Sequence, residues 1–339
     1  ETMWRLLVLL LSAVAIEARV SFAKSEVLDN VDLQGTNKAA FRCSAGCRIF
    51  SPTKTDQIVV IDGAGNKVAT LRMLSEVNLA VERFDLPAGS YELKNVGPPN
   101  PSFVFYAVEV GAANFETEVH YLDDFLSAFF SAEATGNITL LSTSGTVSFY
   151  NFLGFSQLDS LPTIYAAGFD SADACRPVFT ARSAVGLSRT AFVVNSPIAT
   201  VMFDKPADGR WVLVNSDTEG KKQLTNVDSS AVYTTPGYVG CPSVGDALYS
   251  LVPPLTKIDA DATLTNDTGL HIIVNGDYSI ADQADALSLT INDDVMKLYG
   301  KNSISKSYDG SKVDVKLAWK KNEKAKDAFA VQIDVSSTG

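Results

Sequence analysis

Apolar and polar residues alternate with a period of two along most of this chain, and turn-forming residues recur at intervals of roughly 8–12 positions. This rhythm is typical of half-buried β-strands joined by short turns. The clearest hairpin spans 58–71, where the apolar runs Ile58–Ile61 and Val68–Leu71 flank the turn Asp62–Asn66. The pattern predicts an all-β protein made of tandem β-sandwich domains of the jelly-roll or immunoglobulin-like kind.

The strand pattern falls into three stretches. The first covers 19–112 and begins with an N-terminal strand, the second covers 113–250, and the third covers 257–337. Pro253 and Pro254 lie between the second and third stretches, and paired prolines suit an extended linker. We therefore predict three β-rich domains.

One segment of the second stretch departs from the strand rhythm. Its apolar side chains recur at the i, i+3, i+4, i+7 and i+8 spacing of a helix, and two aspartates occupy the first turn, where the helix dipole favours them. The apolar positions are Leu122, Phe125, Leu126, Phe129 and Phe130. The spacing predicts one short amphipathic helix over 122–133 that packs its apolar side on its own domain.

The first eighteen residues have the pattern of a secretory signal peptide. Arg5 precedes an apolar run that ends in the small residue Ala18. The run is shorter than the about 20 apolar residues that a membrane-spanning helix needs. We expect residues 1–18 to be cleaved and the protein to be secreted, without membrane insertion. If the segment were retained, its apolar side would have to pack against protein.

Four cysteines suit an exported chain, in which they are expected to form disulfides. Four cysteines allow three pairings. The spacing favours Cys43–Cys47, which would clamp a tight turn, and Cys175–Cys241, which would close a long loop. A zinc site is the less favoured alternative because no histidine lies near either pair.

Two triplets match the acceptor sequence for N-linked glycosylation, as expected for an exported protein. They begin at Asn137 and Asn266 and end at Thr139 and Thr268. The sequence therefore predicts glycosylation at both asparagines.

The net charge of −11 disfavours nucleic acid and anionic membranes as partners. The third stretch is locally lysine-rich, a composition that is typical of a solvated strand face and that discourages edge-to-edge pairing. Its lysines include Lys312, Lys316, Lys320, Lys321, Lys324 and Lys326.

The sequence offers little for catalysis. It has two histidines, His120 and His271, and both lie in or beside apolar runs. The patterns for a zinc protease or a nucleophile elbow are not present in the sequence, and two histidines leave little material for a Ser/His/Asp or Cys/His site. We therefore predict structural histidines, a protein that is not an enzyme, and no resident cofactor.

The third stretch resembles the later part of a CUB domain, a secreted β-sandwich. The resemblance rests on Asp285–Ile291, the turn Asn292–Asp294, the tripeptide Leu298–Gly300, the segment Gly310–Trp319 and a loop into Ala328–Val331. It is similar to the divergent CUB-like modules of some secreted nematode proteins. The resemblance implies a CUB-like sandwich over 257–337.

Calcium is a second implication of this resemblance. One type of CUB domain binds calcium through acidic residues near the start of the Asp-bearing strand, and the resemblance assigns Asp277 and Asp285 as two of the ligands. Calcium takes six to eight oxygen ligands, so other groups would have to complete the site.

Two functions fit these features. The leading hypothesis is a non-enzymatic extracellular structural protein that polymerises into filaments, because added strands satisfy the backbone groups of exposed sheet edges. The predicted donor is the segment 19–35, whose alternating apolar residues are Val20, Phe22, Val31 and Leu33. The alternative is a soluble extracellular recognition module for a glycan, a microbe or another protein.

Overall fold

The fold is taken from a computed structural model of the chain. It describes residues 19–21, 25–29, 38–50, 58–71, 83–97, 104–111, 117–122, 128–131, 137–142, 146–153, 161–166, 175–182, 187–196, 198–203, 211–215, 228–235, 238, 257–320 and 327–339. The predicted signal peptide, together with Phe22, Val31 and Leu33, lies outside these residues. In the described part of the chain, no helix is long and apolar enough to cross a membrane.

The first unit is a sandwich of two sheets, with strand orders β1-β3-β8-β5-β6 and β2-β9-β4-β7. Its strands are β1 (Arg19–Ser21), β2 (Ser25–Asp29), β3 (Lys38–Cys43), β4 (Cys47–Phe50), β5 (Ile58–Asp62), β6 (Lys67–Leu71), β7 (Arg83–Leu86), β8 (Gly89–Asn95) and β9 (Val104–Glu109). The hairpin predicted at 58–71 is confirmed as β5–β6. Asp62 closes its turn by accepting hydrogen bonds from the backbone N–H groups of Ala64 and Asn66.

The second unit is also a two-sheet sandwich, with strand orders β10-β12-β17-β14-β15 and β11-β18-β13-β16. Its strands are β10 (Glu118–Leu122), β11 (Ala128–Ser131), β12 (Asn137–Ser142), β13 (Val147–Leu153), β14 (Pro162–Ala166), β15 (Phe179–Thr180), β16 (Phe192–Val194), β17 (Ile198–Phe203) and β18 (Trp211–Asn215). The short 3-10 helix η2 (Leu187–Arg189) precedes β16. Its core contains a cluster of phenylalanines, including Phe149, Phe152, Phe179 and Phe192.

The two sandwiches have the same topology. When β1–β9 are matched in order with β10–β18, every pairing of the first sandwich has its counterpart in the second. The agreement includes strand direction: β1 runs parallel to β3 and β10 runs parallel to β12, whereas the other pairings are antiparallel. The chain therefore contains one strand arrangement twice, followed by a unit of different design.

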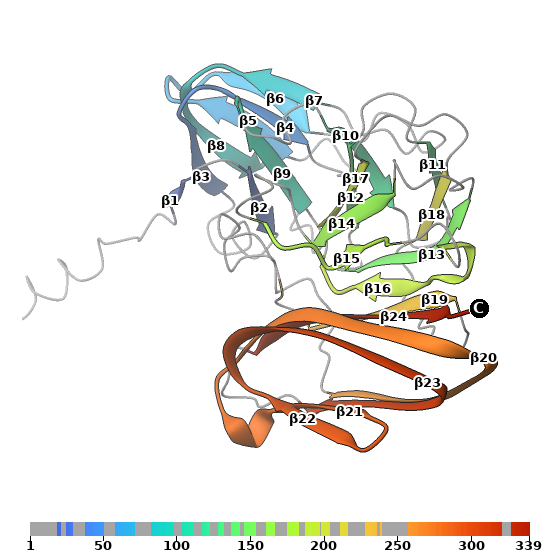
Figure 1. Ribbon diagram of the computed structural model, residues 1–339. Coiled ribbons are helices and arrows are strands. Elements are labelled where there is room, and N and C mark those ends of the chain that lie inside the picture. The colour runs from blue at the N-terminus through green and yellow to red at the C-terminus, as the bar shows by residue number, and fades with distance from the viewer. Residues whose placement is uncertain are drawn as a thin grey trace, which may run out of the picture.

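The third unit is one six-stranded sheet in the order β19-β24-β20-β23-β21-β22. Its elements are β19 (Ser229–Thr234), β20 (Lys257–Ile280), the 3-10 helix η4 (Gln283–Asp285), β21 (Leu287–Ile291), β22 (Asp294–Leu298), β23 (Gly300–Lys320) and β24 (Ala328–Ser337). The long strands β20 and β23 pair along their lengths and bend, as Figure 1 shows. Leu289 and Met296, from one end of the sheet, share a core with Phe329 and Ile333, from the other. The sheet therefore folds over itself to enclose this core.

The prediction of an all-β protein with tandem β-sandwich domains is confirmed, but the predicted helix over 122–133 is wrong. Leu122 ends β10, and residues 128–131 form β11, which pairs with β18. Aromatic residues are enriched in strands, although they can also form the apolar side of a helix. In this fold β18 offers backbone partners to Phe129 and Phe130, and this non-local pairing prevails over the helical spacing.

Two further segments differ from the sequence-based expectation. Residues 229–234, which the pattern assigned to the second domain, form β19 and pair with β24 of the third sheet. The predicted donor segment is occupied within its own chain: β1 pairs with β3 and β2 pairs with β9. In this structure both strands therefore take their pairing partners from their own chain.

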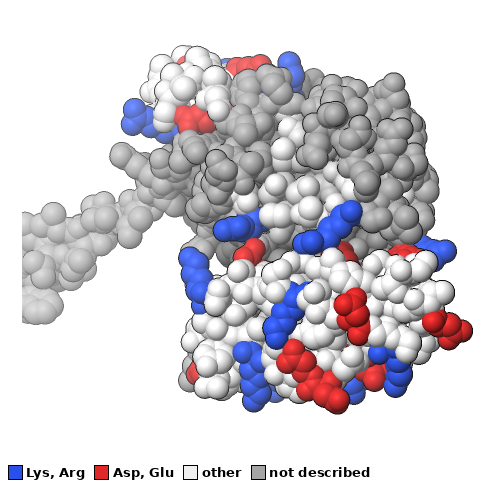
Figure 2. Space-filling view, viewed as in Figure 1, with Lys and Arg blue, Asp and Glu red and all other residues white. Residues whose placement is uncertain are grey.

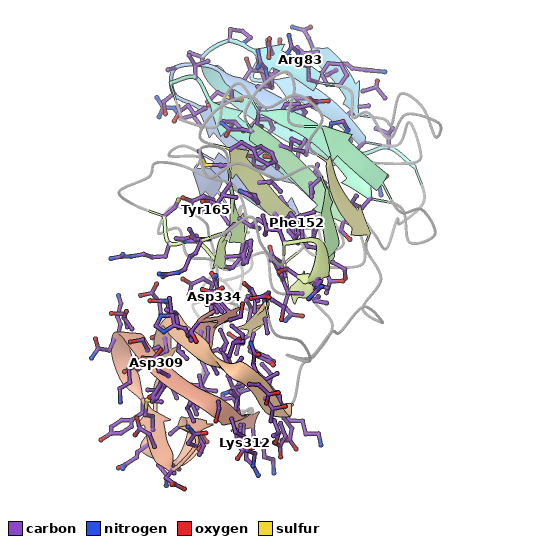
Figure 3. The ribbon with its side chains drawn as sticks, turned by 45° about the vertical axis from the view of Figure 1, so that its right-hand side comes forward. Arg83, Phe152, Tyr165, Asp309, Lys312 and Asp334 are labelled. Carbon is purple, nitrogen blue, oxygen red and sulfur yellow. A yellow bond between two sulfur atoms is a disulfide. The ribbon has the colours of Figure 1, made fainter. Side chains whose placement is uncertain are left out.

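The second sandwich lies between the first sandwich and the third sheet in the view of Figure 3. The apolar core of the second sandwich continues into the third unit, since Val232, Tyr238 and Ala330 belong to the same buried cluster as its phenylalanines. The third sheet is thus docked on the second sandwich through a shared core. The polar residues beside this core form the candidate site.

Candidate functional site

The junction between the second sandwich and the third sheet arises from the alternation of β24. Val331, Ile333 and Val335 point into the core of the third sheet, which turns Gln332 and Asp334 towards the second sandwich. Gln332 binds the backbone of Thr180 in both directions: its Oε1 accepts from the N–H at 2.8 Å, and its Nε2 donates to the carbonyl oxygen at 2.8 Å. This pair of bonds sets β24 against β15.

A cavity of about 370 Å³ opens beside this contact. Its volume lies within the roughly 300–1,000 Å³ range of small-molecule sites. Figure 3 shows Asp334 at this junction. The lining comes from both units: Ala181, Arg182, Leu187 and Thr190 from the second sandwich, and Asp228, Ser229, Ser230, Ile273, Asp334, Val335, Ser336 and Ser337 from the third.

Asp334 is the central group of the cavity. Its Oδ1 accepts hydrogen bonds from Ser230 Oγ and from Gln332 Nε2, both at 2.6 Å. Its buried Oδ2 lies 3.2 Å from Arg182 Nε, an ion-pair distance without the alignment of a hydrogen bond. Burial raises the pKa of Asp334, and the hydrogen bonds from Ser230 and Gln332 together with the charge of Arg182 oppose that rise.

Asp228 supplies a second carboxylate to the lining. Its backbone has a positive φ of 56°, in the left-handed region that aspartate tolerates better than most residues. Its Oδ1 accepts from the N–H and the hydroxyl of Ser337, at 2.8 and 3.1 Å. Ser336 donates its hydroxyl to the carbonyl oxygen of His271 at 3.4 Å.

The lining is rich in polar side chains of both charge signs. It contains carboxylates, a guanidinium group and hydroxyls, but its described residues include no histidine or cysteine. The carboxylate of Asp334 is largely buried, and electrostatic interactions are stronger there than in bulk water. The arrangement therefore provides charge and hydrogen-bonding groups in fixed positions.

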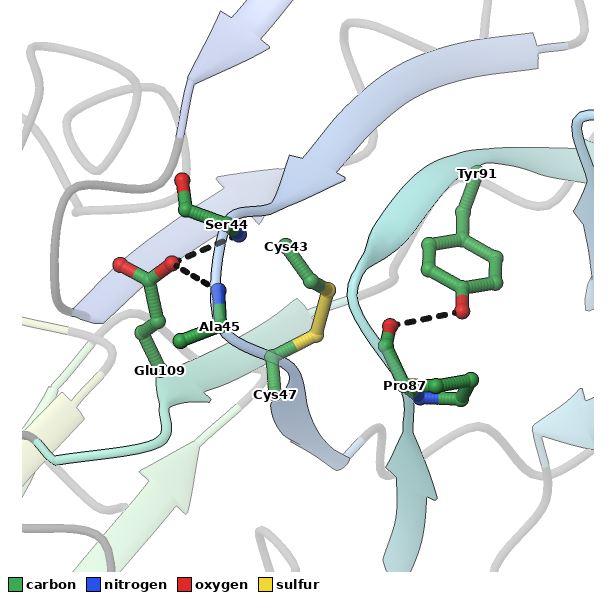
Figure 4. The surroundings of a disulfide bond; sticks show 7 residues. All are labelled: Cys43, Ser44, Ala45, Cys47, Pro87, Tyr91 and Glu109. Atoms are coloured by element: carbon green, nitrogen blue, oxygen red, sulfur yellow. Dashed lines mark hydrogen bonds between the residues drawn. A yellow bond between two sulfur atoms is a disulfide. The ribbon is translucent and has the colours of Figure 1, made fainter.

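The predicted disulfide Cys43–Cys47 is present and joins the end of β3 to the start of β4. Figure 4 shows that Glu109 reaches the intervening turn, where its Oε1 accepts from the N–H groups of Ser44 and Ala45 at 2.7 and 3.1 Å. Cys175 is also disulfide-bonded. Its predicted partner, Cys241, lies outside the described residues.

The two predicted calcium ligands lie in different elements. Asp277 is in β20 and Asp285 ends η4. Among the described residues, no group of three or more His, Cys, Asp or Glu side chains is placed to hold a metal ion. Calcium binding by these aspartates stays a prediction.

The two predicted glycosylation acceptors have different surroundings. Asn137 begins β12, and the threonine of its triplet, Thr139, is fully buried, with its hydroxyl 2.8 Å from that of Thr117. Asn266 lies in a bulge of β20, where its Oδ1 accepts from the N–H and hydroxyl of Thr268. Glycosylation at either site stays a prediction.

Both histidines face carboxylates. His120 Nε2 lies 2.7 Å from Glu118 Oε1, and burial lowers the pKa of His120, although Glu118 opposes that change. His271 Nδ1 lies 2.6 Å from Asp309 Oδ1. Neither histidine lines the cavity.

Several described lysines of the third sheet pair with acidic residues, whereas Lys321, Lys324 and Lys326 lie outside the described residues. Figure 2 shows both signs of charge dispersed over this unit. Lys306 pairs with Asp294, and Lys316 pairs with Asp261. This exposed surface fits the predicted solvated face.

The sequence analysis did not identify Arg182, Asp228 or Asp334. Their positions in the sequence resemble those of ordinary polar residues on solvated strand faces and turns. Only the alternation within β24 indicates that Asp334 points away from the core of its own sheet, and alternation does not reveal which surface it meets.

No protein-family model matches the chain, and no curated protein matches it. Solved structures with some likeness include the CUB1-EGF-CUB2 domain of human MASP-1/3, at 10% identity and a TM-score of 0.21 over 63% of this chain and 94% of that one. The rat MASP-1 counterpart has 9% identity and a TM-score of 0.19, covering 65% and 100%. The secreted serine protease VesC from Vibrio cholerae has 12% identity and a TM-score of 0.20, covering 77% and 63%. CUB-domain proteins are thus among the structural neighbours, at TM-scores too low to carry a functional argument.

Proposed function

We propose that this protein is an extracellular recognition protein that binds a glycan in the cavity between the second sandwich and the third sheet. The observation that carries the proposal is the cavity itself, where groups from two structural units surround Asp334. Ligand sites are commonly found between domains, and they place a few polar groups in a concave surface. The disulfide at Cys43–Cys47 supports export, because disulfides persist in oxidising compartments.

A glycan array probed with the full chain tests this function. We expect binding to a restricted set of glycans and loss of that binding in Asp334→Asn. The matched control is Asp261→Asn, which makes the same substitution at an exposed position of β20 outside the cavity. Binding that is unchanged in Asp334→Asn, or the complete lack of glycan binding, would contradict the proposal.

Filament assembly is a second candidate, favoured by one observation. Both β1 and β2 lie at edges of their sheets, so exchange with a neighbouring molecule would not have to open a sheet interior. Negative-stain microscopy of the native protein tests it: filaments that are lost on deletion of residues 19–35 would support exchange. Single compact particles, or filaments that survive the deletion, would refute it.

A further inference from the structure

Three of the serine hydroxyls that line the cavity already donate their hydrogen within the protein. Ser230 donates to Asp334, Ser337 donates to Asp228, and Ser336 donates to the carbonyl oxygen of His271. A serine hydroxyl has one hydrogen and two lone pairs. These three hydroxyls therefore retain their lone pairs and present acceptors to a ligand.

The carboxylates add to this excess of acceptors. Asp334 Oδ2 is itself buried and accepts no hydrogen bond, with Arg182 Nε 3.2 Å away, whereas Oδ1 of the same side chain already accepts two. Arg182 is the one cationic side chain of the described lining, and it stands against the two carboxylates of Asp228 and Asp334. The formal charge of these groups is +1 − 2 = −1.

From this excess of acceptors and negative charge we infer that the cavity selects a cationic, hydroxyl-bearing ligand, of the class of amino sugars with a free amine. An ammonium group supplies three hydrogen-bond donors and a positive charge, and sugar hydroxyls supply further donors. The inference rests on the proposed glycan-binding function and specifies its ligand class.

The same charged and hydrogen-bond-accepting groups disfavour the binding of two other kinds of sugar. A sugar carboxylate or sulfate would face Asp228 and Asp334, and like charges at close range are unfavourable. An N-acetylated amino sugar has lost the ammonium charge and offers one amide N–H in its place. Both should bind more weakly than the free amine.

The test is calorimetric titration of the full chain with D-glucosamine, N-acetyl-D-glucosamine, D-glucose, D-glucuronate and ethylamine at equal ionic strength. We expect glucosamine to bind at least tenfold more tightly than each of the other probes. Asp334→Asn and Asp228→Asn should each weaken glucosamine binding at least tenfold, and Asp261→Asn should leave it unchanged.

The variant Arg182→Gln distinguishes an effect of Arg182 on ligand charge selection from a purely structural role of this side chain. Arg182 is about half exposed, so the substitution is expected to be tolerated by the fold. Removal of the competing cation should tighten glucosamine binding while glucose binding stays the same or weakens. Far-ultraviolet circular dichroism on each variant separates lost binding from lost folding.

The outcomes separate the ligand class from the proposed function. Equal binding of glucosamine and glucose, tighter binding of glucuronate, or ethylamine binding as tight as that of glucosamine would overturn the inference and leave glycan recognition standing. If every probe failed to bind and the array signal of the native chain were insensitive to Asp334→Asn, the proposed function would fail with it.

Discussion

The two sandwiches share one topology but differ in the make-up of their cores. In the first, the disulfide Cys43–Cys47 is itself part of the buried core. The core of the second contains a phenylalanine cluster, with Phe149 lying 6.2 Å from Phe152 and 5.2 Å from Phe192 between ring centroids. The comparison shows that the strand arrangement does not depend on one particular means of holding it together.

Matched positions make the contrast specific. Cys43 ends β3 as Ser142 ends β12, and Cys47 begins β4 as Val147 begins β13. All four side chains are buried. The first sandwich thus has a covalent bond where the second has a serine and a valine at the same topological corner.

The neighbourhood of the second sandwich differs as well. Its core extends into the third sheet through Val232, Tyr238 and Ala330, and its rim forms the cavity with Asp334. The buried cluster of the first sandwich contains residues of that sandwich only. A repeated fold can therefore leave one copy to form a cavity with a further unit.

The largest expected effect comes from a pair of matched truncations in the two cores. Ile49 and Phe149 are each the third residue of their strand and are both fully buried. We expect Phe149→Ala to cost about 3–5 kcal/mol and Ile49→Ala about 2–5 kcal/mol, because each leaves a cavity.

Hydrogen exchange followed by mass spectrometry measures where each truncation acts. Phe149→Ala should reduce protection in the second sandwich and in β19 and β24, which pack on the same core, while Ile49→Ala should act on β1–β9 alone. Equal loss of protection along the whole chain in both variants would mean that the two sandwiches unfold as one unit.

An intermediate effect is expected from removal of the disulfide. The double variant Cys43→Ala/Cys47→Ala should destabilise the first sandwich by about 2 kcal/mol on the chain-entropy model for a loop closed over a sequence separation of 4. Ser142→Ala is the control at the matched corner, where no cross-link is lost. A melting curve unchanged by the double variant would show that the turn is held by other contacts, such as those of Glu109.

The smallest effect concerns pH, and it has opposite signs in the first sandwich and at the junction between the second sandwich and the third sheet. Arg48 donates to Asp85 and holds the pKa of that carboxyl below 3.8, so its stabilisation is present above pH 3.8 and is lost as pH falls through the lowered pKa. Burial holds the pKa of Asp334 above 3.8. Its ionisation therefore weakens the junction above the raised pKa, and this penalty is relieved as pH falls towards 3.8.

Regional hydrogen exchange across this pH range, corrected for the intrinsic exchange rate, checks both signs. The difference in stability between the native chain and Asp334→Asn should shift in favour of the native chain as pH falls towards 3.8. As pH falls below 3.8, the difference in stability between the native chain and Asp85→Asn should shift against the native chain in the first sandwich. If the difference in stability between the native chain and Asp334→Asn did not change with pH, the pKa of Asp334 in the folded protein would be close to its ordinary value.

Local patterns predicted much of the fold but little of the site. Alternation located the β5–β6 hairpin and most strands, because a half-buried strand exposes every second side chain to water. It misassigned residues 128–131, where helical spacing and aromatic strand propensity compete and pairing with β18 decides. It assigned β19 to the wrong unit, since a strand pattern does not indicate which sheet will accept the strand.

The sequence by itself determined that this chain is an all-β protein and that Cys43 and Cys47 pair, because both depend on residues that are close along the chain. The tertiary structure alone decided that the same topology occurs twice and that Arg182 and Asp334 meet across a junction. Strand partners and contacts between units are set by side chains distant in sequence, and such contacts leave no periodic pattern in the chain. The cavity follows from those distant contacts.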